Sequence, residues 1–173
     1  MAKVVVNKTR WNQIKRNLRS KKAEVQIGWF EGQMHDGRSN TPIPMAQIAQ
    51  WVEEGQRWQN QPARPAIRQY FIPLVADSLD LQVVLMRDIA KVADGKMSWS
   101  ALHQKLGTKL VPVMQHVLQE YKVVANKPST VKKKGFNDPW VETGALIAAV
   151  KFKVGDYKLY PSRNYKAGTV RWN

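Results

Sequence analysis

Alternating hydrophobic residues predict a strand at each end of the central part of the chain. In residues 24–30, Val25, Ile27 and Trp29 alternate with polar or small residues, the pattern of a half-buried strand. Residues 150–154 repeat this alternation with lysines at the polar positions, which predicts a strand with one dry and one basic face. Residues 155–173 could add a further strand.

Apolar residues that recur at steps of three and four predict helices between these strands. One helix is expected over residues 44–54, with Pro44 in its first turn and Gly55 as its C-terminal cap. A long second helix should run from near Pro65 to Val92, and Pro73 is a point where it could kink. Its expected apolar face is formed by Ile67, Phe71, Leu74, Ser78, Leu81, Leu85, Ile89 and Val92.

A third helix is predicted between Ser98, as its N-cap, and Tyr121. Pro112 lies inside this segment and should bend it. Residues 31–44 and 123–139 are rich in turn-forming and polar residues, so both are expected to be irregular loops. Thr143 can then cap a short helix over residues 144–149. These elements together predict an α+β fold, in which a small antiparallel sheet packs against two long helices.

The distribution of charge divides the chain into three parts. The sequence has 28 Lys and Arg against 13 Asp and Glu, a net charge of +15. Residues 1–22 and residues 122–173 each carry a net +8, whereas residues 23–121 carry −1. We therefore expect a basic N-terminal arm (1–23), one domain (24–154) and a basic C-terminal extension (155–173). Such a charge favours a polyanionic neighbour, either nucleic acid or an acidic protein surface.

Composition argues against several classes of protein. The sequence has no cysteine and only three widely separated histidines, so neither a disulfide framework nor a zinc site is expected. No apolar run approaches the length of a membrane span, and the three-valine run near the N-terminus is too short for a signal peptide. The expectation is a soluble protein that is used without secretion.

We find no pattern of residues that predicts catalysis. Glu53 and Glu54 are adjacent at a helix end and face different directions, and Ser98 and Ser100 are explained by helix capping. The Lys-Lys-Lys-Gly at 132–135 lacks the GxxxxGK[ST] pattern and follows a helix, so it does not predict a phosphate-binding loop. The sequence predicts no enzyme, no cofactor and no metal. A small nuclease would need clustered acidic metal ligands, which the acid-poor ends do not supply.

The tryptophans fall into two groups. Trp29 and Trp99 lie on predicted apolar faces and are expected in the core. The others outside helices, Trp11, Trp58, Trp140 and Trp172, lie in predicted loops or tails, where aromatic residues favour interfaces.

Between residues 24 and 154, the order of motifs resembles the neck or tail-completion proteins of tailed bacteriophages, the group that includes the virion-morphogenesis proteins. The motifs are IGWFEG, PMAQIAQWVEEG, PARPAIRQYF, DGKMS, a PST..KKG loop and PWVETGALIAAVKF. Thr143, Gly144 and Leu146 match a Pro-Leu-Ile-Asp-Thr-Gly-x-Leu-type family sequence, and Trp140 and Glu142 depart from it. The Arg-Pro at 64–65 also matches, whereas an aromatic residue and a leucine usually follow it.

The resemblance implies a non-enzymatic virion protein, assembled in the host cytoplasm. It would form a ring, most commonly a homohexamer, that joins the head-side connector to tail terminator, sheath or tube proteins and lets DNA pass. The alternative is a sequence-independent DNA-binding protein, which the net charge favours. Candidate subunit-interface or DNA-facing residues are Arg64, Arg68, Lys132, Lys133, Lys134, Trp140 and Thr143, and candidate residues of the basic arm are Lys15, Arg16, Arg19, Lys21 and Lys22.

Overall fold

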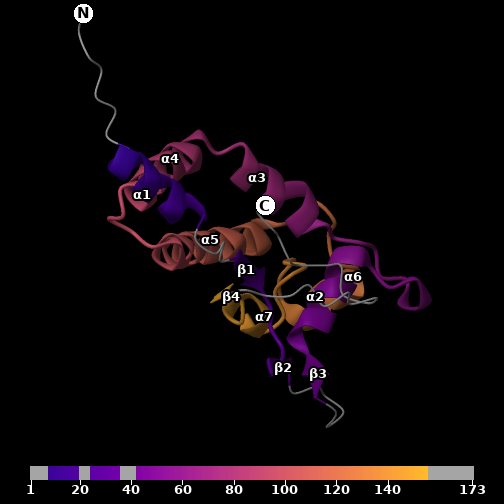
Figure 1. Cartoon of the computed structure of the whole chain (residues 1–173). Coiled ribbons are helices and arrows are strands. Elements are labelled where there is room, and N and C mark those ends of the chain that lie inside the picture. Colours follow the sequence, from indigo (N-terminus) through magenta and orange to yellow (C-terminus); the bar gives the residue numbers. More distant parts are fainter. Residues whose placement is uncertain (1–7, 20–23, 36–41, 156–173) are drawn as a thin grey trace, which may run out of the picture.

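A two-stranded antiparallel ladder lies against the helix α5 (Trp99–Glu120) near the centre of the fold (Figure 1). The computed structural model describes residues 8–19, 24–35 and 42–155. Strand β1 (Glu24–Gly28) pairs with β4 (Lys151–Gly155), so that Ile27 lies opposite Phe152. Both predicted strands are confirmed, and the arrangement is the expected mixture of helix and sheet.

The close packing of β4 on α5 depends on a glycine. Gly107 is buried in α5, and a Cβ atom at this position would overlap the aromatic ring of Phe152. Real side chains do not approach so closely, because such a contact lies far inside the van der Waals minimum. The Phe152 ring therefore occupies the space that any other residue at position 107 would need.

The predicted second helix is divided into separate elements, which corrects the expectation of two long helices. A π-helical turn, η2 (Ile67–Phe71), leads directly into α3 (Ile72–Ala76). The chain then becomes extended at Ser78, and α4 (Leu79–Ala93) begins. Pro73 has no N–H to donate to the preceding turn, and the Ser78 hydroxyl accepts from the Leu81 N–H at 3.3 Å. Ser78 is thus a cap between two helices and does not belong to one continuous apolar face.

Helix α2 (Met45–Glu54) agrees with its prediction, and its last turn fixes the start of η2. The Glu53 side chain is buried, and its carboxylate accepts from the backbone N–H groups of Ile67 (3.1 Å) and Arg68 (3.0 Å). Gly55 ends α2 with φ 76°, where a Cβ atom would also meet the backbone of Gln61–Ala63. The short 3₁₀ turn η1 (Arg57–Gln59) follows. Glu53 is therefore a structural cap for the start of η2.

Parts of both predicted loops contain regular structure. Within the first loop, β2 (Met34–His35) pairs with β3 (Ile43–Pro44), while residues 36–41 lie outside the described residues. Within the second, Pro128 begins the helix α6 (Pro128–Lys134), and Gly135 ends it in the left-handed conformation. Proline at a helix start and glycine just past its end are the favoured positions for these residues, so the expectation that residues 123–139 are irregular was wrong for Pro128–Lys134.

The short helix before β4 forms close to its predicted position. It is α7 (Ala145–Ala148), and its N-cap position is occupied by Gly144. The Thr143 hydroxyl accepts from the Ala145 N–H at 3.3 Å, so Thr143 assists the helix start from one residue earlier than a standard N-cap. Gln115 of α5 holds the other end, since its amide donates to the Ile147 carbonyl at 3.1 Å.

Part of the predicted basic arm is an ordered helix. Residues Lys8–Arg19 form α1, which packs against α4 (Figure 1). The segment predicted as a basic arm thus includes a helix that contacts α4. Residues 155–173 were predicted as a basic extension, and beyond Gly155 they lie outside the described residues.

A buried carboxylate holds α4 against α5. Asp88 of α4 is buried, and its side chain forms ion pairs with Lys105 of α5 and with Lys91 one turn along α4 (2.8 Å). Hydrogen bonds from Lys105 first, and then from Lys91, lower the pKa of Asp88 from its ordinary 3.8 to about 2. The ionised form is thus favoured in the folded protein.

This pKa predicts a specific acid sensitivity. Because the folded pKa lies below the unfolded one, the ion pairs stabilise the fold fully above about pH 4, and this contribution is lost as the pH falls through about 2. Denaturation of Asp88→Asn should show a loss of stability at neutral pH that shrinks between about pH 4 and 2. The exposed Asp77→Asn serves as the control, and a loss for Asp88→Asn that stays constant down to pH 2 would contradict the assignment.

Candidate nucleic-acid interface

Helix α1 is held in place by polar contacts with the start of α5 and the end of α4. The Asn17 amide donates to the Ala93 carbonyl at 3.1 Å, and the Trp99 indole donates to the Asn17 carbonyl at 3.0 Å. The Arg10 guanidinium lies 3.6 Å from the Asp94 carboxylate. Trp99, predicted as a core residue, is half-buried and serves as an anchor for α1.

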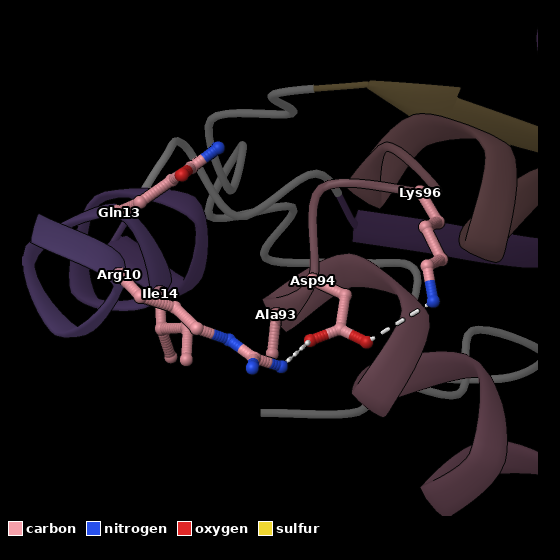
Figure 2. Close-up of a pocket in the computed structure, with 6 residues that line it drawn as sticks. All are labelled: Arg10, Gln13, Ile14, Ala93, Asp94 and Lys96. Atoms are coloured by element: carbon pink, nitrogen blue, oxygen red, sulfur yellow. Dashed lines mark ion pairs between the residues drawn. The ribbon is translucent and has the colours of Figure 1, made fainter. Parts of the chain in front are cut away.

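A small cavity lies where α1 meets the end of α4 (Figure 2). Arg10 and Lys96 approach the Asp94 carboxylate from two sides, at 3.6 and 3.4 Å, while the Gln13 side chain points away from it. The cavity has a volume of about 260 Å³. The one carboxylate that lines the cavity, Asp94, already forms ion pairs with Arg10 and Lys96. These ion pairs connect α1 with the end of α4, and the lining contains no second acidic or histidine side chain for acid–base chemistry.

The side of α1 that faces away from α4 is basic. At 100° per residue, Lys8, Lys15 and Arg19 fall on one side of the helix, and Arg16 lies at its edge. The opposite side carries Asn17, which contacts α4. Helix α1 contains no acidic residue, and the exposed Trp11 lies beside the basic side, with the Lys15 amine 5.7 Å from its ring centroid. We call Lys8, Lys15, Arg16 and Arg19 the basic face of α1.

The structure places the predicted arm residues in two groups. Lys15, Arg16 and Arg19 belong to the basic face of α1. Lys21 and Lys22 lie outside the described residues. A row of arginine and lysine side chains on one face of a helix fits the spaced phosphates of a nucleic acid, without any requirement for base contacts.

The lysines of α6 form a separate basic region. Lys132 and Lys133 are exposed, whereas Lys134 turns inward, where its amine donates to the Asp138 carbonyl at 2.8 Å. Burial lowers the pKa of Lys134. Figure 1 places α6 and α1 at opposite ends of the molecule, so these lysines do not extend the basic face of α1.

Arg64 is buried in the protein and is not on a surface that could contact another subunit or DNA. Only 7% of it is exposed, its Nε donates to the Val124 carbonyl (3.3 Å) and a terminal nitrogen donates to the Asn126 side chain (3.2 Å). Burial lowers the pKa of its guanidinium. Arg64 is therefore not available as an interface residue. It instead connects the segment before η2 with the segment after α5.

Trp140 is also buried and is not available as an interface residue. It is 2% exposed, and its ring stacks on Trp29 with centroids 6.3 Å apart and planes 9° from parallel. Trp29 in turn donates from its indole nitrogen to the Leu146 carbonyl at 2.7 Å. The loop position of Trp140 suggested an interface, but the stacked pair makes it part of the core together with Trp29, whose predicted burial is confirmed.

Arg68 and Thr143 remain accessible. The Arg68 side chain is largely exposed, although its Nε lies 3.4 Å from the Glu53 carboxylate. Thr143 is exposed and its hydroxyl serves the start of α7. Neither residue belongs to α4, the helix against which α1 packs.

Prediction from the sequence missed an exposed apolar stripe on α4. Leu79, Val83 and Met86 are 74%, 56% and 71% exposed, and Ala90 continues the same line. These positions lie about one half-turn around the helix from the buried Asp88. Their i, i+4, i+7, i+11 spacing was present in the sequence, but the apolar residues on the inner side of α4 were taken as its only apolar face. We call these four residues the outer stripe.

Other kinds of site find no support among the described residues. They contain no group of three or more His, Cys, Asp or Glu side chains that could hold a metal ion. None of the described helices is long and apolar enough to cross a membrane. Comparison with family models, with curated proteins and with solved structures found no match to this chain.

Proposed function

We propose that this protein is a structural virion protein of a tailed phage, without enzymatic activity. It forms a ring in the neck that joins the head connector to the tail and lets DNA pass. The outer stripe of α4 is the observation that carries this proposal. A contiguous exposed apolar stripe on a helix is typical of a surface that binds a partner, and within the described structure the outer stripe stays exposed although α1 and α5 pack against other parts of α4.

The order of the motifs in residues 24–154 indicates which kind of assembly the protein would join. They resemble neck and tail-completion proteins, and a ring subunit needs large protein contacts of the kind that the outer stripe offers. The basic face of α1 suits a lumen through which DNA slides, because lysine and arginine contacts with phosphates do not depend on sequence.

Electron microscopy tests this function. Negative-stain images of the purified protein at high concentration, and of assembled particles, should show rings and a density for the protein between head and tail. A strictly monomeric protein that has no place in the particle would refute the proposal.

Sequence-independent DNA binding is the second candidate, and the basic face of α1 favours it. In this case Arg16→Gln/Arg19→Gln should weaken duplex binding and make the slope of log K against log salt shallower by about 2, roughly one unit per phosphate contact. The variant Lys132→Gln/Lys133→Gln removes the same charge from α6 and should change binding less. Equal effects of the two variants would show that net charge alone determines binding.

A further inference from the structure

We infer that the outer stripe of one copy docks into an apolar hollow on the α5–β4 side of a second copy. This inference rests on the proposed ring and names the surfaces that form it. The hollow has a volume of about 380 Å³. It is lined by Thr108, Val111, Pro112, Val150, Lys151 and Phe152.

The two surfaces lie on different sides of the chain. Asp88 points from α4 toward Lys105 of α5, and the outer stripe lies on the opposite side of α4. The hollow is formed where α5 meets β4, and Figure 1 shows α4 and β4 on opposite sides of α5. The stripe of a chain is therefore directed away from its own hollow, and contact between the two requires a second molecule.

Shape and polarity agree on the two sides of the proposed contact. The stripe is a convex ridge that contains Leu79 and Met86, both more than 70% exposed. The hollow is bordered by Val111 and Pro112 of α5 and by the Phe152 ring, which is fixed over Gly107. Burial of a leucine and a methionine side chain in such a hollow would remove their apolar surface from water and so stabilise the contact.

Charge complementarity identifies a second copy as the occupant. Two exposed carboxylates, Asp77 and Asp80, adjoin the start of the stripe, and neither forms an ion pair with another described residue. Lys151 lies on the rim of the hollow and is exposed. The acids would repel nucleic acid, whereas they attract the lysine of a neighbouring copy.

A contact between two different surfaces of the same chain is heterologous, and its repetition closes into a ring or extends into a filament. A contact of the stripe with itself would be two-fold symmetric and would stop at a dimer. The proposed pairing thus accounts for assembly beyond a dimer from a single kind of contact.

Disulfide cross-linking tests the pairing, because the natural sequence has no cysteine. The double variant Met86→Cys/Thr108→Cys, oxidised after assembly, should give a ladder of covalent oligomers on a non-reducing gel, and the ladder should collapse on reduction. Each single variant alone should remain uncrosslinked. An equimolar mixture of the two single variants should give covalent dimers, since both thiols meet wherever the stripe of a Met86→Cys copy docks into the hollow of a Thr108→Cys copy.

The outcomes separate this inference from the proposed function. Covalent dimers from Met86→Cys alone would show that two stripes meet and would overturn the pairing. Rings that form but fail to cross-link in the double variant would also overturn it, while the proposed ring function would stand. A double variant that remains monomeric at high concentration, in a protein that is absent from the particle neck, would refute both.

Discussion

Replacement of Trp140 by alanine is expected to lower the free energy of unfolding by about 3–5 kcal/mol. The side chain is 2% exposed and stacks on Trp29, so truncation removes a large buried surface, leaves a cavity and removes an aromatic contact. Urea denaturation followed by circular dichroism measures this loss as a decrease in the midpoint at an unchanged slope.

Trp58 supplies a matched control for Trp140. It is 75% exposed, so Trp58→Ala should change stability by no more than about 0.5 kcal/mol. If both tryptophan variants had the same small effect, Trp140 could not be part of the core, and its earlier interpretation as an interface residue would regain support.

Replacement of Gly107 by alanine is expected to destabilise the protein by about 1–3 kcal/mol, the usual cost of overpacking a core. The direction of the change in stability is informative, because replacement of glycine by alanine at an exposed position inside a helix would stabilise the protein by about 1 kcal/mol. The added methyl group would overlap the Phe152 ring and force β4 away from α5. The hollow at this position would change shape as well, so oligomer formation should weaken together with stability.

Gln104→Ala is the control for Gly107→Ala, since Gln104 is exposed in the same helix. It should be neutral or slightly stabilising, because alanine is the better helix former. Thermal unfolding of the two variants side by side measures the difference. An increase in the melting temperature for Gly107→Ala would show that the Phe152 ring does not occupy this space in solution.

The elements that the sequence predicts well are those with a clear period and clear ends. Strand β1, strand β4, helix α2 and helix α5 each combine regular apolar spacing with a turn residue or a cap, such as Ser98 before α5. The Ser98 hydroxyl accepts from the Ala101 N–H at 3.1 Å, as an N-cap should. Local signals were sufficient for these elements.

Continuity of a helix was harder to predict than its presence. Residues 65–92 keep an apolar spacing of three and four, but the helix changes from π to α geometry just before Pro73, and it ends before the extended Ser78. Ser78 matched the three-and-four spacing and was placed on the apolar face, whereas its hydroxyl caps α4. A serine within an apolar pattern can therefore indicate a new helix start.

Burial of loop residues depends on contacts that are distant in sequence. Trp140 is buried by Trp29, and Arg64 is satisfied by Val124 and Asn126. Helix α1 was predicted as part of an arm because its many basic residues are typical of an exposed segment. Its contacts with α4 involve residues far away in the sequence, such as Asn17 with Ala93. Such pairings lie beyond any local pattern, so the sequence predicted candidate residues without showing which of them are accessible.

The proposed function places this chain in a ring between the head and the tail of an assembled particle. A cryo-electron microscopy reconstruction of the neck would show such a ring. We expect a closed ring of identical subunits, each with α5 against the β1–β4 ladder, with the outer stripe of α4 against the next subunit and the basic face of α1 toward the lumen. A neck reconstruction without this fold, or with a single isolated copy of it, would contradict the proposal.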